Sequence, residues 1–278
     1  MKRTIWMTSC MLAALCLLLL SAACSKKETP EEQPAASNPA ATTAPATPID
    51  PATAATVIGT VKFEGTAPKP ATIDMSQDPN CKGSNKAENV VVGDGQLANV
   101  FVYVKEGLSN RTFEAPKDVV TLDQSGCRYH PHVMGVMAGQ TIKILNSDPT
   151  THNIHPSPNP GSGNREWNES QAPQSASLEK TFGREEIMLP VKCNQHPWMK
   201  MFISVVKTPF YAVSGPDGKY ELKGLPPGDY TLAFVHEKFG EKTQKVTLAG
   251  KESKTVDISF QPRYIAVLTA AFGRGVGY

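Results

Sequence analysis

The chain has 278 residues and is nearly neutral, with 28 basic residues against 26 acidic ones. This balance argues against an electrostatic nucleic-acid binder, which needs a clustered basic face. Twenty-three prolines and 21 glycines favour turns, strands and linkers over helix bundles. At 40 % apolar residues, the chain can supply one or two globular cores.

The first 23 residues predict an export signal. Lys2 and Arg3 precede a nearly continuous apolar stretch, which ends in the sequence Leu-Ser-Ala-Ala before Cys24. This stretch is too short and has the wrong flanks for a membrane-spanning helix. The ending resembles the lipobox of bacterial lipoproteins, which implies that Cys24 carries lipid. By the same resemblance, Ser25 implies the outer membrane, facing the periplasm; plain secretion is the alternative.

Residues 24–54 predict a lipidated cysteine followed by a tether rich in proline and alanine. The segment has few large apolar residues, so it cannot bury a core and should stay extended.

Short β-branched runs dominate the next part of the chain, residues 55–208, and none of its longer runs has helical periodicity. Short strands separated by frequent turns are typical of a β-sandwich or barrel. We therefore predict an all-β domain here, with strands at residues 56–63, 98–104, 119–122, 140–145, 186–189 and 201–206.

Residues 209–262 predict a second β-module, with two strong turns around Gly215 and Gly228. The stretch DGKYELKGLPPGDYTLAFVHE resembles the carboxypeptidase regulatory-like, prealbumin-type β-sandwich. This implies a structural or docking module without peptidase activity. Because so small a unit buries little surface alone, we expect it to pack on the preceding domain and to share the strand near Val57. The tail, residues 263–278, receives no assignment.

Three cysteines remain once the expected signal and the lipidated cysteine are set aside: Cys81, Cys127 and Cys193. An odd number in an oxidising compartment leaves one thiol that needs another fate, such as a metal. We expect Cys81 to pair with Cys127.

The sequence Cys-Asn-Gln-His-Pro-Trp-Met at residues 193–199 lies between two predicted strands. The thiolate of Cys193 and the imidazole of His196 can hold one ion from one short loop, with the thioether of Met199 nearby. A second imidazole could come from His152, which follows another predicted strand. Two histidines, one cysteine and a weak axial methionine form the blue-copper arrangement.

These two stretches also resemble the cupredoxins. The sequence CNQHPWM is similar to the ligand loop of amicyanin, HNIH is similar to the upstream histidine region of the same group, and the spacing from Asn146 to His152 is similar to plastocyanin. The resemblance implies a Greek-key β-sandwich holding one type 1 copper. It implies the ligands His152, Cys193, His196 and Met199, with Asn146 and Asn153 stiffening the site. Met201 is the alternative axial ligand, because plastocyanin and pseudoazurin place methionine five positions after the loop histidine.

Other histidines receive structural interpretations. His155 could be a fifth ligand or a substitute for His152, but we favour an exposed place at a loop edge, since a separation of three in a strand puts it on the face opposite His152. His130 and His132 could form a second metal site with Cys127, but we favour places for them at the surface or in packing. The long segment 156–177 could cover the metal, dock a partner or do neither. Trp198 could shield the metal or provide an exit for electrons.

The sequence thus predicts an envelope-tethered copper protein that carries electrons between redox partner proteins. We find no nucleophile–base pattern, paired acid–base carboxylates or phosphate-binding glycine loop, so we do not expect an enzyme. The alternatives are a copper-binding or delivery protein without redox turnover and a structural β-sandwich interaction protein.

Overall fold

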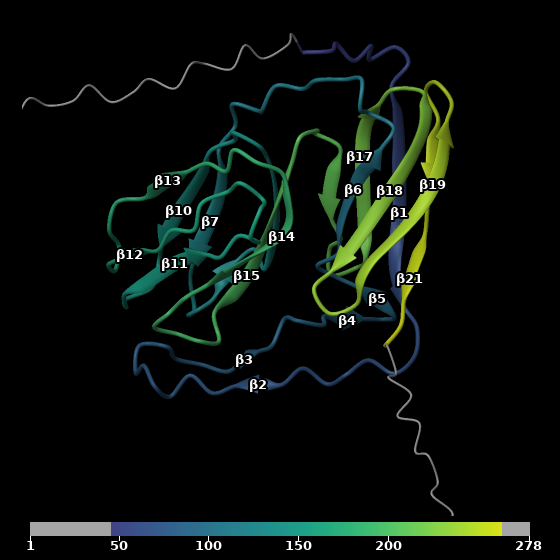
Figure 1. The fold of residues 1–278 in the computed structure, drawn as a ribbon. Helices are drawn as coiled ribbons and strands as arrows, with labels where there is room; N and C mark the ends of the chain where they lie inside the picture. Colours follow the sequence, from purple (N-terminus) through teal and green to yellow (C-terminus); the bar gives the residue numbers. More distant parts are fainter. Residues whose placement is uncertain (1–45, 263–278) are drawn as a thin grey trace, which may run out of the picture. The chain divides into compact units, whose positions relative to one another are not determined.

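The computed structural model describes residues 46–262 (Figure 1). Within this range the chain forms β-strands and no α-helix, so the predicted all-β class is confirmed. None of the described residues forms a helix that could cross a bilayer. The export signal, the lipidated Cys24 and the C-terminal tail lie outside the described residues.

The strands divide into three consecutive groups along the chain. The first group comprises β1 (Ala55–Phe63), β2 (Thr72–Ile73), β3 (Asn85–Lys86), β4 (Val92–Gly93), β5 (Gln96–Leu97) and β6 (Phe101–Glu106). The second comprises β7 (Val120–Gln124), β8 (Tyr129–His130), β9 (Val133–Met137), β10 (Ile142–Asn146), β11 (His152–Pro156), β12 (Glu169–Gln171), β13 (Leu178–Lys180), β14 (Glu186–Lys192) and β15 (Lys200–Val206). The third comprises β16 (Tyr211–Val213), β17 (Lys219–Leu225), β18 (Gly228–His236), β19 (Gly240–Leu248), β20 (Ser253–Thr255) and β21 (Ile258–Phe260).

Strands of the first and third groups build one pair of sheets. One sheet has the order β17-β1-β5-β4, with β20 and β21 also paired to β1, and the other has the order β16-β6-β18-β19. Buried and less buried residues alternate along β1, and its buried side chains enter a core shared by both sheets. This alternation is the period of two that a strand with one face in a core requires.

The second group of strands builds the sheets that carry the candidate site. One has the order β13-β10-β7-β8 and the other β12-β11-β14-β15-β9, and they enclose a separate core. Within the second sheet β14 and β15 form an antiparallel hairpin, while β9 runs parallel to β15. The loop of this hairpin is the segment that the sequence singles out for metal binding.

The sheets do not divide at residue 208 as the sequence predicts. β1 and β6 precede that position, yet they pair with strands β17, β18, β20 and β21 that follow it. Both strands supply buried side chains to the core that the C-terminal strands also line, so the C-terminal module shares its core with them. The expected sharing of the strand near Val57 is what the pairing of β1 shows.

β6 lies between two cores. Val102 and Val104 enter the core it shares with β1, while Phe101 and Tyr103 point the other way and pack with residues of β9 and β15. Both faces of the strand are therefore buried, and completely burying a side chain such as Phe101 contributes roughly 1.5–3 kcal/mol. The two pairs of sheets are joined through this strand.

The tether predicted to extend to residue 54 ends earlier. Thr47 donates a backbone hydrogen bond to the carbonyl of Thr112, and Ile49 packs against the core around β1. These two contacts hold the segment from Thr47 to Ile49 against the fold.

Candidate metal centre

Three side chains predicted as ligands come together from two segments of the chain. His152 is the first residue of β11, Cys193 directly follows β14, and His196 lies in the loop that leads to β15. One ligand atom from each lies within 4.8 Å of the others, and all three residues are buried. The hairpin β14–β15 and its neighbour β11 place them at one end of the same sheet.

The ligand atoms face a common point. Nδ1 of His152 lies 2.9 Å from Nδ1 of His196, and Sγ of Cys193 lies 3.7 Å from Nδ1 of His196. The two imidazole rings meet at 69° with centroids 4.7 Å apart, so their Nδ1 atoms approach edge-on. The arrangement presents two nitrogens and one sulfur to a single small ion.

Both imidazoles have a carboxylate behind them. Nε2 of His152 lies 2.8 Å from Oδ2 of Asp148, and Nε2 of His196 lies 3.0 Å from Oδ2 of Asp78. Hydrogen bonds from the Thr150 hydroxyl and the backbone amide of Asn80 lower the pKa of Asp78 to about 2, so it is ionised near neutral pH. Burial lowers the pKa of His152, with the hydrogen bond to Asp148 opposing the shift, so its ring is neutral there.

The thiol of Cys193 is held mainly by Asn153. Its sulfur lies 3.5 Å from the backbone nitrogen of Asn153 and 3.3 Å from the side-chain oxygen, which also accepts a hydrogen bond from the backbone of Asn194 at 2.8 Å. The backbone carbonyl of Asn153 accepts from the hydroxyl of Tyr129. Asn153 thus fixes the position of the sulfur through both its backbone and its side chain.

Asn146 braces the stretch that leads to His152. Its side-chain amide donates to the carbonyls of Thr150 and Gln171, and its oxygen accepts from the backbone of Asp148. The two asparagines that the resemblance implies thus make hydrogen bonds within the segments carrying His152 and Cys193.

The hairpin register separates the two candidate axial methionines. The backbone nitrogen of Cys193 donates to the carbonyl of Met199, whereas Met201 pairs with Val191. Residues directly opposite in an antiparallel pair have side chains on the same face, about 5 Å apart at Cβ. Both methionines are buried, but Met199 is the cross-strand neighbour of the thiol.

His155 lies outside the cluster. Its ring nitrogens contact the side-chain oxygen of Asn194 at 2.9 Å and Glu166 at 2.5 Å, and it lies half-buried within β11, so the expected exposed place at a loop edge is wrong. His130 contacts the carbonyl of Ser125, and His132 contacts Glu237 at 2.6 Å.

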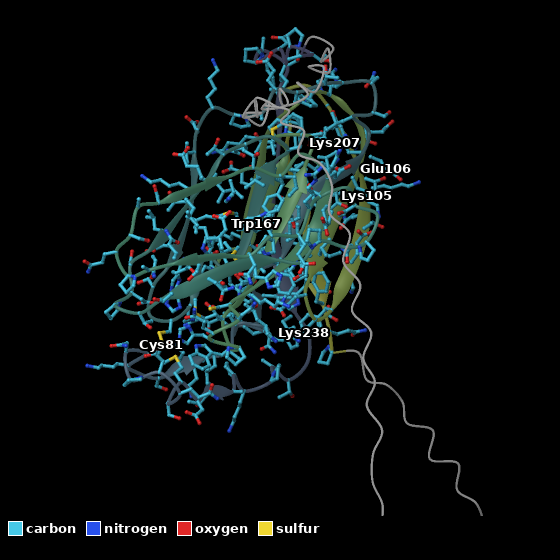
Figure 2. All side chains as sticks on the ribbon, turned by 60° about the vertical axis from the view of Figure 1, so that its left-hand side comes forward. Cys81, Lys105, Glu106, Trp167, Lys207 and Lys238 are labelled. Carbon is cyan, nitrogen blue, oxygen red and sulfur yellow. A yellow bond between two sulfur atoms is a disulfide. The ribbon has the colours of Figure 1, made fainter. Side chains whose placement is uncertain are left out.

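The long segment between residues 156 and 177 folds back onto the ligand strand. Its β12 pairs with β11, placing Gln171 opposite His152, and Asn168 accepts a hydrogen bond from Asn153. Trp167, labelled in Figure 2, packs against Phe182. The segment therefore extends the sheet that carries His152 and makes a hydrogen bond to Asn153.

Cys81 and Cys127 form a disulfide, drawn as the yellow bond beside the Cys81 label in Figure 2. Cys193 is the free cysteine among the described residues. The thiol that remains after this pairing is thus the one that lies between the two histidines.

Trp198 lies beside the ligands at the surface. Its ring centroid is 5.1 Å from that of His196, and its indole nitrogen donates to the carbonyl of Cys127. The same side chain lines a hollow of about 260 Å³ together with residues from both pairs of sheets, among them Arg128, Glu237 and Lys238.

Sequence reasoning missed the two carboxylates behind the imidazoles. Asp148 could have been noticed, because it precedes His152 by four residues on the same loop. Asp78 has no local signal, since it is 118 residues away from His196.

Comparison with solved structures finds low-scoring similarities to copper proteins. The Cu-containing nitrite reductase (NirK) from Thermus scotoductus SA-01 is 19 % identical over 37 % of this chain and 25 % of its own, with a TM-score of 0.30. A reduced Cu(I) amicyanin variant is 19 % identical over 37 % of this chain and 97 % of its own, with a TM-score of 0.28. A purple cupredoxin from Nitrosopumilus maritimus is 18 % identical over 31 % of this chain and 98 % of its own, with a TM-score of 0.26.

TM-scores in this range are too low to carry a functional inference, which has to come from the site. The chain spans a quarter of the length of the nitrite reductase that it matches. No curated protein sequence matches it. Residues 196–261 match the family model of the carboxypeptidase regulatory-like domain, so the predicted module of this kind is confirmed, over a segment that starts before residue 209.

Proposed function

We propose that this protein binds one copper ion and carries single electrons between partner proteins. His152, Cys193 and His196 would hold the ion, with Met199 as the axial ligand. Bound copper would supply one-electron exchange between its two common oxidation states. Imidazole, thiolate and thioether in this combination suit copper better than they suit magnesium, calcium or manganese, which prefer oxygen ligands.

The observation that carries the proposal is the 2.9 Å approach of the two inward Nδ1 atoms beside the buried thiol. If each ring donates its one proton to the carboxylate behind it, both Nδ1 atoms present lone pairs to each other. Two lone pairs at this distance repel. Both nitrogens and the sulfur of Cys193 would bind a cation held here, which would remove this repulsion.

The surroundings of the ligands also suit electron exchange. His152, Cys193 and His196 are each at most 3 % exposed, and hydrogen bonds from the chain hold both ring edges and the sulfur. Ligands held in this way change position little when the charge of a bound ion changes, and burial keeps water from joining the site.

The proposal extends to the cell. We place the protein in the bacterial envelope, anchored through lipid on Cys24 at the outer membrane, with redox proteins as its partners and no catalytic reaction of its own. A Cys24→Ala variant should move from the membrane fraction to the soluble periplasmic fraction. Unchanged membrane retention would contradict the lipid anchor.

Copper titration of the purified protein without its first 24 residues tests the metal site. We expect one equivalent of Cu(II), an intense blue thiolate-to-copper absorption band and reversible reduction. Cys193→Ser should abolish the band. His130→Gln is the matched control, because its ring contacts only a backbone carbonyl outside the cluster and its loss should leave the band unchanged.

Other outcomes decide against electron transfer. Tight, colourless Cu(I) binding without reversible redox chemistry would favour copper delivery. A protein that takes up no copper would favour a structural interaction protein, and a blue colour that survives in Cys193→Ser would overturn the ligand assignment.

A further inference from the structure

The histidines of the candidate centre each use one nitrogen inward and one outward. The outward nitrogens lie 2.8 Å from Asp148 and 3.0 Å from Asp78. A neutral imidazole carries one N–H, and a carboxylate can only accept it, so each contact favours the proton on Nε2. The lone pair of Nδ1 is then left free to face the other ligands.

Each carboxylate is itself fixed by further donors. The two oxygens of Asp148 each accept a backbone amide at 2.7 Å, one from Gly126 and one from Cys127. Asp78 accepts the hydroxyl of Thr150 at 2.7 Å and the backbone amide of Asn80 at 2.8 Å. Neither aspartate can turn away from its histidine without breaking these bonds.

The disulfide connects these two arrangements. Cys81 donates its backbone amide to the carbonyl of Asp78, and its partner Cys127 donates its own amide to Asp148. Cys127 also accepts the indole N–H of Trp198, which lies in the ligand loop. A covalent bond far from both ligand segments in sequence thus holds together the turns that orient His152 and His196.

The segment around Asp78 also covers the outer edge of His196. This histidine is 3 % exposed although it lies in a hairpin loop, where side chains are commonly accessible. Asp78 lies in the stretch between β2 and β3. These two strands pair with each other and are not part of the sheet that contains the hairpin β14–β15. That stretch has little regular structure of its own and is held here by the disulfide and by the bonds of Asp78.

We propose that Asp78 and Asp148 are positioning residues that hold the two imidazoles with Nδ1 toward Cys193, and that the Cys81–Cys127 disulfide fixes both carboxylates in place. This inference deepens the proposed copper site and rests on it for the purpose of the positioning. The alternative is that the two aspartates only stabilise their own turns and do not orient the histidines. It predicts loss of stability without any change at the centre.

The first test replaces Asp78, which accepts one backbone amide where Asp148 accepts two. Asp78→Ala should weaken Cu(I) binding by about 10- to 100-fold in competition with a chelator, the usual effect of losing the partner of a ligating histidine. It should also shift the blue absorption band. Asp78→Asn keeps an acceptor oxygen and should recover part of the affinity. Asp217→Ala, in an exposed turn, is the control and should bind copper like the unaltered protein.

A second readout needs no metal. In the metal-free protein, nitrogen NMR should show a proton on Nε2 of His196 that exchanges slowly with water, and Asp78→Ala should make it exchange rapidly. If Asp78→Ala remains folded and both its copper affinity and this exchange rate are unchanged, the positioning role is overturned. If the unaltered protein binds no copper, the proposed function fails, while the exchange rate still decides whether Asp78 holds the ring.

The third variant tests the fastening. Cys81→Ser with Cys127→Ser should weaken copper binding in the same direction as Asp78→Ala and speed the exchange at both histidines. Thermal unfolding of each metal-free variant checks that it folds. A folded double variant with unchanged affinity and unchanged exchange would overturn the role of the disulfide.

Discussion

Met199 and Met201 are both buried and two residues apart, but only Met199 faces Cys193 across the hairpin. We therefore predict that Met199→Leu changes the reduction potential and the absorption spectrum of the copper-loaded protein, because the axial ligand tunes both. Met201→Leu should leave both unchanged. Each exchange conserves volume and should cost less than about 1.5 kcal/mol of stability. Voltammetry and visible spectroscopy measure the difference, and a reversed pattern would assign the axial position to Met201.

His236 gives the fold a dependence on pH away from the metal centre. The residue is 1 % exposed and its ring stacks on Phe239, and burial lowers its pKa to about 4. Among its charged neighbours, Glu237 raises the pKa, while His132 and Lys238 lower it further. In the unfolded chain His236 has a pKa near 6.5, so it binds a proton at pH values where the folded chain does not. The stability that this difference contributes is present above pH 6.5 and is lost as the pH falls toward 4.

The expected loss from His236 is about 3 kcal/mol across that range, at 1.36 kcal/mol for each pKa unit. Denaturant unfolding of the unaltered protein and of His236→Asn at pH 7, 5.5 and 4.5 measures it. Asparagine can still accept the backbone amide that Lys238 donates to the ring. The variant should show a flatter profile, and equal slopes in the two proteins would show that other groups control the pH dependence.

Strand β9 packs closely against side chains of the other pair of sheets at Gly135. A Cβ at this glycine would lie 2.5 Å from Cδ2 of Tyr211 and 2.7 Å from Cε2 of Phe101, both in the core between the sheets. We predict that Gly135→Ala costs at least about 1–3 kcal/mol, the usual range for overpacking a core. Thermal or denaturant unfolding measures this loss.

Gly183 offers a control for that substitution. A Cβ there meets nothing within 4 Å, and its backbone is not in the left-handed region. Gly183→Ala should leave stability unchanged or raise it by up to about 1 kcal/mol, through the lower entropy of the unfolded chain. Equal losses at the two glycines would show that the contact with Tyr211 is not what matters.

Most long strands follow from local sequence, because a strand that faces one core alternates its residues, as in β1. β9 was missed, since the glycine at its centre interrupts the β-branched pattern that predicts a strand. β11 was also missed, because its sequence His-Asn-Ile-His-Pro has only one residue of strong β-propensity. Strand partners could not be read from the sequence, since β1 pairs with strands more than 150 residues later.

For the whole molecule, the shared strands predict how the chain can be divided. A protein of residues 55–208 would keep β1 and β6 but lose their partners β16, β17, β18, β20 and β21, leaving the core between these sheets open. We predict that this fragment does not fold cooperatively, whereas a protein of residues 46–262 unfolds in a cooperative transition. Circular dichroism during heating tests both, and a stable, cooperatively folded 55–208 fragment would contradict this view.

The candidate site shows the same limit of local reasoning. Cys193, His196 and Met199 lie on one loop, so their spacing alone predicts that they bind together. Asp78 enters only through the tertiary fold, because no sequence period links it to a hairpin 118 residues away. Local spacing thus predicts the three ligands of the hairpin loop, whereas Asp78 reaches His196 only through the tertiary fold.

The burial of His196 has a consequence for how any electron would reach the centre. Because Asp78 contacts its outward nitrogen, the imidazole of His196 is buried and has no exposed edge that a partner protein could contact. The indole of Trp198 is the aromatic neighbour of His196, and it lines the same hollow as Lys238. A partner protein bound in that hollow would contact both pairs of sheets. The regulatory-like module would then form part of the docking surface.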